Sequence, residues 1–177
     1  MAKIRKVERK TKKLFLFFVL LSFFRIFANT KLRDMTQRQK LLLGTMLLLV
    51  GGITYLLFRP STLLMFHVAD YLGFSPVIDR IREGMTNAWL PEFIVYSLPG
   101  ALWSAAYLLT ADCFLQGQTV KTRLMITSII PLIGAVSELL QLTGLLPGTY
   151  DGWDLLCYLI PYLLYLTCIT KNKLIWI

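Results

Sequence analysis

The chain has 177 residues, of which 56% are hydrophobic and 16% are charged, and its mean hydropathy is +0.61. So little charge excludes an ordinary soluble domain, which needs a charged surface, and indicates an all-α polytopic membrane protein. The formal net charge of +9 does not indicate nucleic-acid binding, because seven of the nineteen Lys and Arg residues fall within Met1–Lys13 and most others flank apolar runs. That distribution is typical of topology determinants and of contacts with anionic membrane lipids.

Residues 1–34 form a basic and apolar N-terminal extension. Its apolar run, Leu14–Phe27, is short for a membrane span and has basic residues on both sides, so we expect an interfacial helix on the cytoplasmic leaflet. A membrane-spanning Leu14–Phe27 is the alternative, and it would place seven cationic residues outside. Met35 is a second candidate for the natural start.

Residues 35–177 are predicted to form one transmembrane domain. A helix needs about 20 residues to cross the roughly 30 Å hydrocarbon core. Four apolar segments are predicted to do so, namely Leu41–Phe58, Phe93–Leu115, Leu124–Leu146 and Leu155–Ile169. The fourth segment is short, but Trp153 and Trp176 bracket it as interfacial anchors. We therefore expect a four-transmembrane-helix bundle.

Basic residues in the short flanks predict the orientation of this bundle. They precede the first segment, separate the second from the third and follow the fourth: Lys31, Arg33, Arg38, Lys40, Lys121, Arg123, Lys171 and Lys173. This places both termini in the cytoplasm, in a multi-pass protein of the bacterial cytoplasmic (inner) membrane. Asp112, near the inner end of the second segment, is expected to have a local role at the cytoplasmic interface.

The connection 59–92 is patterned like short helices rather than like a plain loop. Ser75 and Pro76 have the residue types of a helix N-cap and first helical position. The residues that follow place apolar and charged side chains on opposite faces. We expect one or two additional interfacial amphipathic helices on the outer membrane surface.

Acidic residues gather at the predicted outer hairpin, SELLQLTGLLPGTYDGWD. At a rise of 1.5 Å per residue, Glu138 lies about 12 Å inside the end of the third segment, where an unpaired carboxylate is unfavourable. The short turn brings the outer ends of two segments together. We therefore expect an outward-facing pocket, roofed by helices from Ser61–Met85, whose ligand-binding residues are Glu138, Gln141, Asp151 and Asp154.

Several functions fit that set of oxygen atoms. The pocket could bind an envelope lipid, glycolipid or peptide, hold a divalent cation, or carry out acid–base chemistry on an envelope lipid. Alternatively, the acids only stabilise the hairpin of a subunit with a partner membrane protein, with Asp154 capping the fourth segment and Glu138 bonded to Tyr158, Tyr162 or Tyr165. No Walker loop, GxSxG, HExxH or CxxC array is present, so we expect no metal or cofactor and assign no catalytic residue.

The stretch SELLQLTGLLPGTYDGWDLLCYLI resembles the VanZ-like family of small integral membrane proteins. Glu138 and Gln141 match the Glu and Gln near the end of one span in that family, and Asp151 and Asp154 match its D-x-x-D signature. The chain departs from the pattern at Tyr158, where the family often has Asn. The resemblance implies a polar site on the outer side of a four-helix bundle, with an accessory or envelope-protective role.

Overall fold

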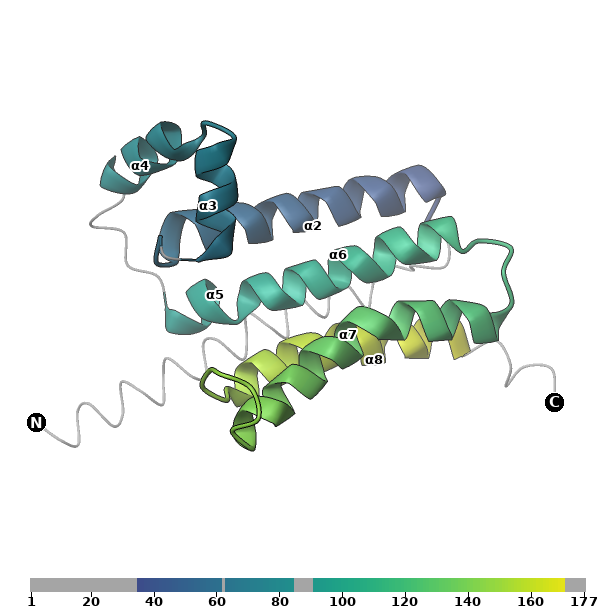
Figure 1. Cartoon of the computed structure of the whole chain (residues 1–177). Helices are drawn as coiled ribbons and strands as arrows, with labels where there is room; N and C mark the ends of the chain where they lie inside the picture. Colours follow the sequence, from purple (N-terminus) through teal and green to yellow (C-terminus); the bar gives the residue numbers. More distant parts are fainter. Residues whose placement is uncertain (1–34, 62, 85–90, 171–177) are drawn as a thin grey trace, which may run out of the picture.

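The computed structural model describes residues 35–61, 63–84 and 91–170, and every regular element within these residues is a helix (Figure 1). Four helices are long: α2 (Gln37–Phe58), α6 (Leu98–Phe114), α7 (Val120–Leu142) and α8 (Gly152–Thr170). Three are short: α3 (Leu64–Tyr71), α4 (Ser75–Gly84) and α5 (Glu92–Tyr96). The all-α class predicted from the sequence is confirmed.

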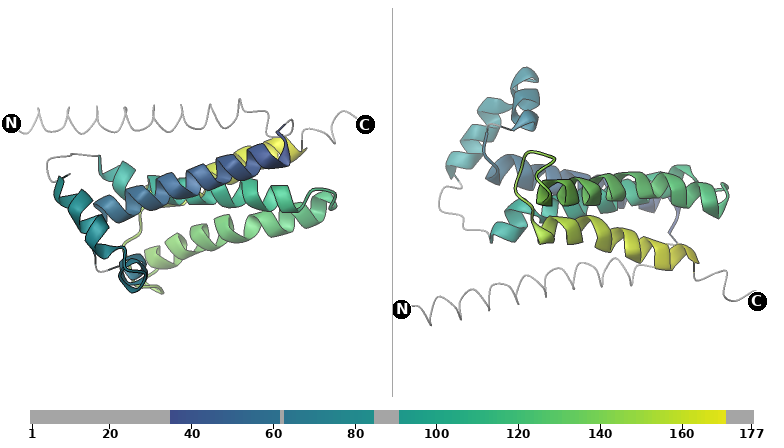
Figure 2. Two further views of the ribbon diagram at one scale, coloured as in Figure 1. Left: turned by 90° about the horizontal axis from the view of Figure 1, so that it is seen from above. Right: turned by 60° about the horizontal axis from the view of Figure 1, so that its bottom comes forward.

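The four long helices run side by side, and α6 contacts each of the other three (Figures 1 and 2). Helices α3 and α4 fold away from the bundle at the end where α2 stops. The short α5 and the α7–α8 hairpin lie at this same end, whereas the α6–α7 connection lies at the opposite end. We call these the hairpin end and the basic end of the bundle.

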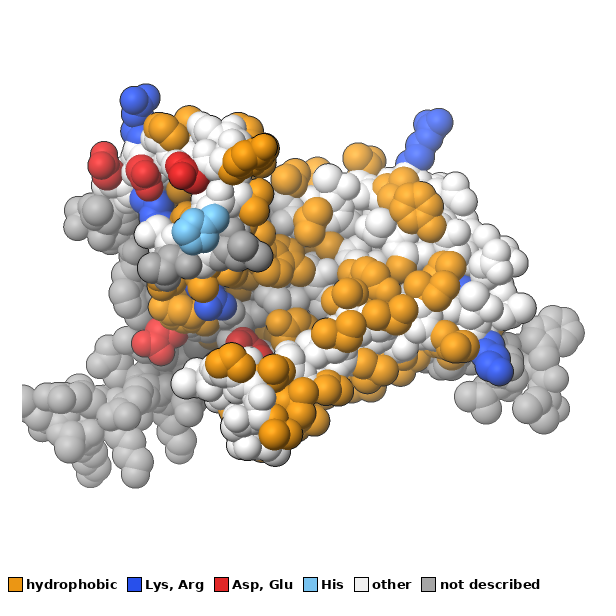
Figure 3. Space-filling model, in the orientation of Figure 1, with side chains coloured by type: hydrophobic (Ala, Val, Ile, Leu, Met, Phe, Trp, Pro, Cys, Tyr) orange, Lys and Arg blue, Asp and Glu red, His pale blue; other side chains and the backbone are white. Residues whose placement is uncertain are grey.

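Three of the long helices are long and apolar enough to cross a membrane: α2, α7 and the Gly152–Ile169 part of α8. These helices carry exposed hydrophobic side chains, among them Leu49 of α2, Ile133 of α7 and Leu163 of α8. On the face seen in Figure 3, hydrophobic side chains spread along the bundle and charged side chains gather toward its two ends. The interior is supplied mainly by α6, whose buried residues include Leu102, Ala105 and Leu109. Apolar groups on the outside of a bundle are stable only against lipid or another protein.

Helices α2 and α7 differ at their ends from the predicted segments because of local capping. A capping box starts α2 at Gln37: the Gln39 amide donates to Thr36 Oγ1 at 3.3 Å, and the Thr36 amide donates to Gln39 Oε1 at 2.9 Å. A Schellman motif ends α7 at Leu142, because Gly144 adopts φ +73° and its amide donates to the Gln141 carbonyl at 3.1 Å. The hairpin after α7 is therefore longer than predicted.

The second predicted segment, Phe93–Leu115, is divided into α5 and α6 at Ser97. Pro99 is the reason, because a proline nitrogen carries no hydrogen and cannot donate to the carbonyl of Val95 in the preceding turn. The Ser97 amide still donates to the Phe93 carbonyl at 2.9 Å. The break therefore tilts the chain without separating the two helices, and it brings the Ser97 side chain into the bundle, where it is 2% exposed.

Two glycines allow aromatic rings to pack directly on helix backbones. A Cβ atom on Gly51 of α2 would lie 2.6 Å from Nε1 of Trp103, and one on Gly134 of α7 would lie 2.6 Å from the ring of Tyr158. Both separations are shorter than a carbon contact allows, so any larger residue would push the helices apart. Trp103 thereby fixes α6 against α2, and Tyr158 fixes α8 against α7.

A buried ionic cluster joins all four long helices at the basic end. The carboxylate of Asp112 in α6 is 6% exposed and accepts hydrogen bonds from Lys40 Nζ of α2 at 2.6 Å and from the Tyr165 hydroxyl of α8 at 2.7 Å. Arg123 of α7 donates to the same carboxylate. The sequence interpretation of Lys40 and Arg123 as flanking topology charges missed this role.

Several predicted features lie outside the described residues. These are the interfacial helix at Leu14–Phe27, the anchor Trp176 and four of the flanking basic residues, Lys31, Arg33, Lys171 and Lys173. They stay predictions.

The single histidine, His67, is exposed on α3.

Replacing Asp112 with Asn should destabilise the bundle. The change leaves the buried Lys40 and the partly exposed Arg123 without a counter-charge, and breaking a buried ion pair typically costs about 3–5 kcal/mol. Thermal unfolding of the purified protein in detergent measures the effect, with the exposed Asp79→Asn as the matched control. An Asp112→Asn midpoint equal to that of the control would show that the cluster does not hold the helices together.

Candidate functional site

A small polar cavity lies at the hairpin end of the bundle. Its volume is about 130 Å³, and it is bounded by residues of α2, α5, α6 and α8 and of the short segments joining them: Tyr55, Arg59, Tyr96, Ser97, Pro99, Gly100, Trp103, Asp154 and Tyr158. We call it the Arg59–Asp154 pocket. Its lining includes no residue of Ser61–Met85, so the expected roof from this segment is not formed over it by the described residues.

Arg59 supplies the positive charge of this pocket. It follows the last residue of α2 and donates from Nη2 to the Tyr96 carbonyl at 2.7 Å. The guanidinium carbon also lies 5.3 Å from the ring centroid of Tyr55 and 4.7 Å from that of Tyr96, which are cation–π distances. These contacts fix the side chain, yet its Nε is buried and has no hydrogen-bond partner among the described residues.

Asp154 supplies the negative charge. Its carboxylate interacts with the Ser97 hydroxyl and lies within electrostatic range of Arg59. One oxygen, Oδ1, is buried and has no hydrogen-bond partner within the described part of the chain. Buried polar atoms are normally paired, since leaving one unpaired costs about 1–3 kcal/mol. The pocket therefore presents one donor and one acceptor that a polar ligand group could satisfy.

Asp151, rather than Asp154, caps α8. Asp151 Oδ1 accepts a hydrogen bond from the Trp153 amide at 2.9 Å, and the Asp151 carbonyl accepts the first helical bond, from the Leu155 amide at 3.2 Å. This is the N-cap arrangement, in which a side-chain oxygen satisfies a free amide of the first turn. The expectation that Asp154 is the cap is wrong, and its carboxylate remains available to the pocket.

Glu138 and Gln141 shape the hairpin and do not line the pocket. Glu138 is 6% exposed, and its Oε2 accepts a hydrogen bond from the Asp151 amide at 3.2 Å. The Gln141 side chain packs on Gly148, where φ is +138° and a Cβ atom would lie 2.8 Å from the Gln141 amide carbon. The structure thus brings Glu138 and Asp151 into contact, with Asp154 within electrostatic range of Glu138, and places Gln141 at the turn. Of these four residues, only Asp154 lines the Arg59–Asp154 pocket.

Three alternatives predicted from the sequence, a metal site and two tyrosine partners of Glu138, can be compared with this geometry. Within the described residues, no three or more His, Cys, Asp or Glu side chains form a group that could hold a metal ion. Tyr165, one of three tyrosines considered as a partner of Glu138, is bonded to Asp112 at the other end of the bundle. Tyr158 lies within electrostatic range of Glu138 and also lines the pocket.

Sequence reasoning missed Arg59 as a site residue. A cation directly after a predicted span, next to Pro60 and level with an acidic hairpin, is the signal that could have identified it.

No protein-family model, curated protein or solved structure matches the chain.

The bond from the Asp151 amide to Glu138 gives a test of the hairpin. Glu138→Gln should preserve it, because the amide oxygen of glutamine can also accept this hydrogen bond, whereas Glu138→Ala should destabilise the hairpin by about 1–3 kcal/mol. Hydrogen–deuterium exchange over residues 143–151 measures this difference. Equal exchange in the Gln and Ala variants would mean that Glu138 does not support the turn.

Proposed function

We propose that the protein is a four-span membrane protein that binds the polar head of an envelope amphiphile in the Arg59–Asp154 pocket. Three helices have the length and composition of membrane spans. Helix α6 runs between them and would complete the bundle as the fourth span. Exposed basic residues at the opposite end, Arg38 and Lys121, favour an orientation with that end in the cytoplasm and the pocket facing outward.

The observation that carries the binding proposal is the pair of unpartnered buried atoms, Arg59 Nε and Asp154 Oδ1, beside one cavity. Charged groups inside a membrane protein are costly and usually mark a functional site. The cavity of about 130 Å³ is smaller than the roughly 300–1,000 Å³ of typical ligand pockets. It therefore suits the polar group of a larger ligand rather than a whole ligand.

The VanZ-like resemblance is part of the same proposal. It depends on Glu138, Gln141, Asp151 and Asp154. In this reading the first three build the hairpin, and Asp154 contacts the ligand. An accessory or envelope-protective role would follow from retention of an envelope lipid or glycolipid at the outer leaflet.

Asp154→Asn tests the binding proposal. The change removes the negative charge from the pocket and keeps the shape of the side chain, so retention of the ligand should fall about tenfold. Mass spectrometry of lipids and glycolipids co-purified per mole of protein from native membranes measures it. The exposed acid Glu92 provides the control variant, Glu92→Gln. Equal retention in both variants would contradict the proposal.

The orientation is tested by labelling. Tyr150→Cys places a thiol on the exposed hairpin, whereas Lys121→Cys places one on the exposed α6–α7 end. In intact cells, a membrane-impermeant maleimide should label the hairpin thiol and spare the other. The buried Cys113 and Cys157 and the half-buried Cys168 are replaced with Ala beforehand. The reverse labelling pattern would place the pocket in the cytoplasm.

A further inference from the structure

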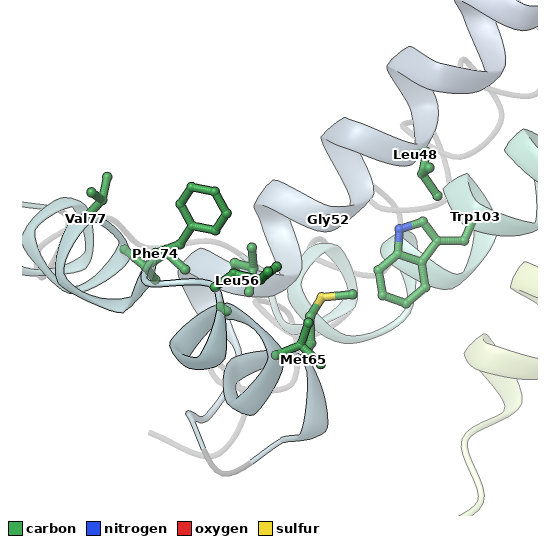
Figure 4. Close-up of a pocket in the computed structure, with 11 residues that line it drawn as sticks. Leu48, Gly52, Leu56, Met65, Phe74, Val77 and Trp103 are labelled. Atoms are coloured by element: carbon green, nitrogen blue, oxygen red, sulfur yellow. The ribbon is translucent and has the colours of Figure 1, made fainter.

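An apolar groove of about 720 Å³ runs between α2 and the α3–α4 pair (Figure 4). Its walls include Leu48, Gly52 and Leu56 from α2, Met65 from α3, Phe74 before α4 and Val77 from α4. Every residue that lines it is apolar or glycine. This volume falls within the roughly 300–1,000 Å³ range of ligand-binding pockets.

The groove and the Arg59–Asp154 pocket share one residue, Trp103. One hollow is purely apolar, whereas the other contains a cation and an anion. Two adjoining hollows of this kind match the two ends of an amphiphile. An acyl chain would bury apolar surface along α2, and the head group attached to it would reach the charged pair past the Trp103 ring.

We propose that the ligand is a phospholipid with a phosphoethanolamine head, its acyl chain in the groove and its head in the Arg59–Asp154 pocket. This inference rests on the proposed function. Arg59 Nε is an unpartnered donor, which a phosphate oxygen satisfies, and Asp154 Oδ1 is an unpartnered acceptor, which an ammonium N–H satisfies.

The same two atoms discriminate against other common head groups. A phosphocholine head carries both charges, but its quaternary ammonium has no N–H to donate to Asp154. A phosphoglycerol head has hydroxyl donors but no positive charge to offset the carboxylate. A head group that has both a phosphate and a primary ammonium offers Arg59 an opposite charge and a hydrogen-bond acceptor. It also offers Asp154 an opposite charge and a hydrogen-bond donor.

The groove is held open by contacts of Arg82. This residue of α4 donates from Nη1 to the Leu56 carbonyl at 3.1 Å, and its guanidinium lies 5.1 Å from the ring centroid of Phe66. These contacts attach α4 and α3 to the end of α2. In the α2 wall, Gly52 has no side chain, and a Cβ atom there would meet nothing within 4 Å. A large side chain at this position would occupy the groove without displacing a neighbouring helix.

Gly52→Phe therefore tests the assignment, because the new side chain fills the groove. Thr45→Phe is the control, since Thr45 is an exposed residue of α2 outside the groove. The full chain is reconstituted in phosphatidylcholine vesicles containing a trace of photoreactive phosphatidylethanolamine with a diazirine in one acyl chain. Wild type and Thr45→Phe should be labelled on peptides containing Met65 and Val77, and Gly52→Phe about tenfold less. The corresponding phosphatidylcholine probe should label wild type about tenfold less than the ethanolamine probe.

Each outcome decides part of the inference. Equal labelling by the two probes would overturn the head-group assignment. Unchanged labelling in Gly52→Phe would overturn the groove assignment, while loss of co-purified lipid in Asp154→Asn would still support the proposed function. If Gly52→Phe fails to fold, the label map of wild type decides: adducts concentrated at Met65 and Val77 support the groove, and equal adducts at the exposed Ile133 of α7 overturn it.

Discussion

The buried carboxylate of Asp112 is the point on which the arrangement of the bundle depends. It contacts one residue from each of the other long helices, namely Lys40 of α2, Arg123 of α7 and Tyr165 of α8. Charges removed from water are stable only when they are paired and hydrogen-bonded, so these four side chains must meet at one level. That requirement fixes the longitudinal register of α2, α6, α7 and α8 at the basic end.

The hairpin end is fixed by close packing rather than by charge. Trp103 rests on the backbone of α2 at Gly51, and Tyr158 rests on α7 at Gly134. The same two aromatic residues form walls of the Arg59–Asp154 pocket. The packing that holds α6 and α8 in place therefore also shapes the pocket, and the pocket can be rigid although it lies near the end of the bundle.

The acidic residues of the hairpin have different roles, because the free amides at the start of α8 need hydrogen-bond acceptors. The free Trp153 amide at the start of α8 donates to the Asp151 side chain, and the Asp151 amide donates to Glu138. These bonds use two of the three acids for structure. Asp154, at the third position of the helix, is left to face Arg59 and Ser97. An acidic cluster in sequence thus becomes one carboxylate that lines the Arg59–Asp154 pocket and two that stabilise the hairpin.

The sequence by itself determined the all-α class, the long apolar helices and the short helices after Arg59, because length, hydropathy and periodicity are local properties of the chain. Caps readable in the sequence, Thr36 and Gly144, account for where α2 begins and α7 ends. Only the tertiary structure decided which charges meet. Lys40 and Asp112 are 72 residues apart, and Arg59, directly after α2, lies within electrostatic range of Asp154 in α8. Such pairings depend on how the helices pack, and the pattern of a single sequence does not encode that packing locally.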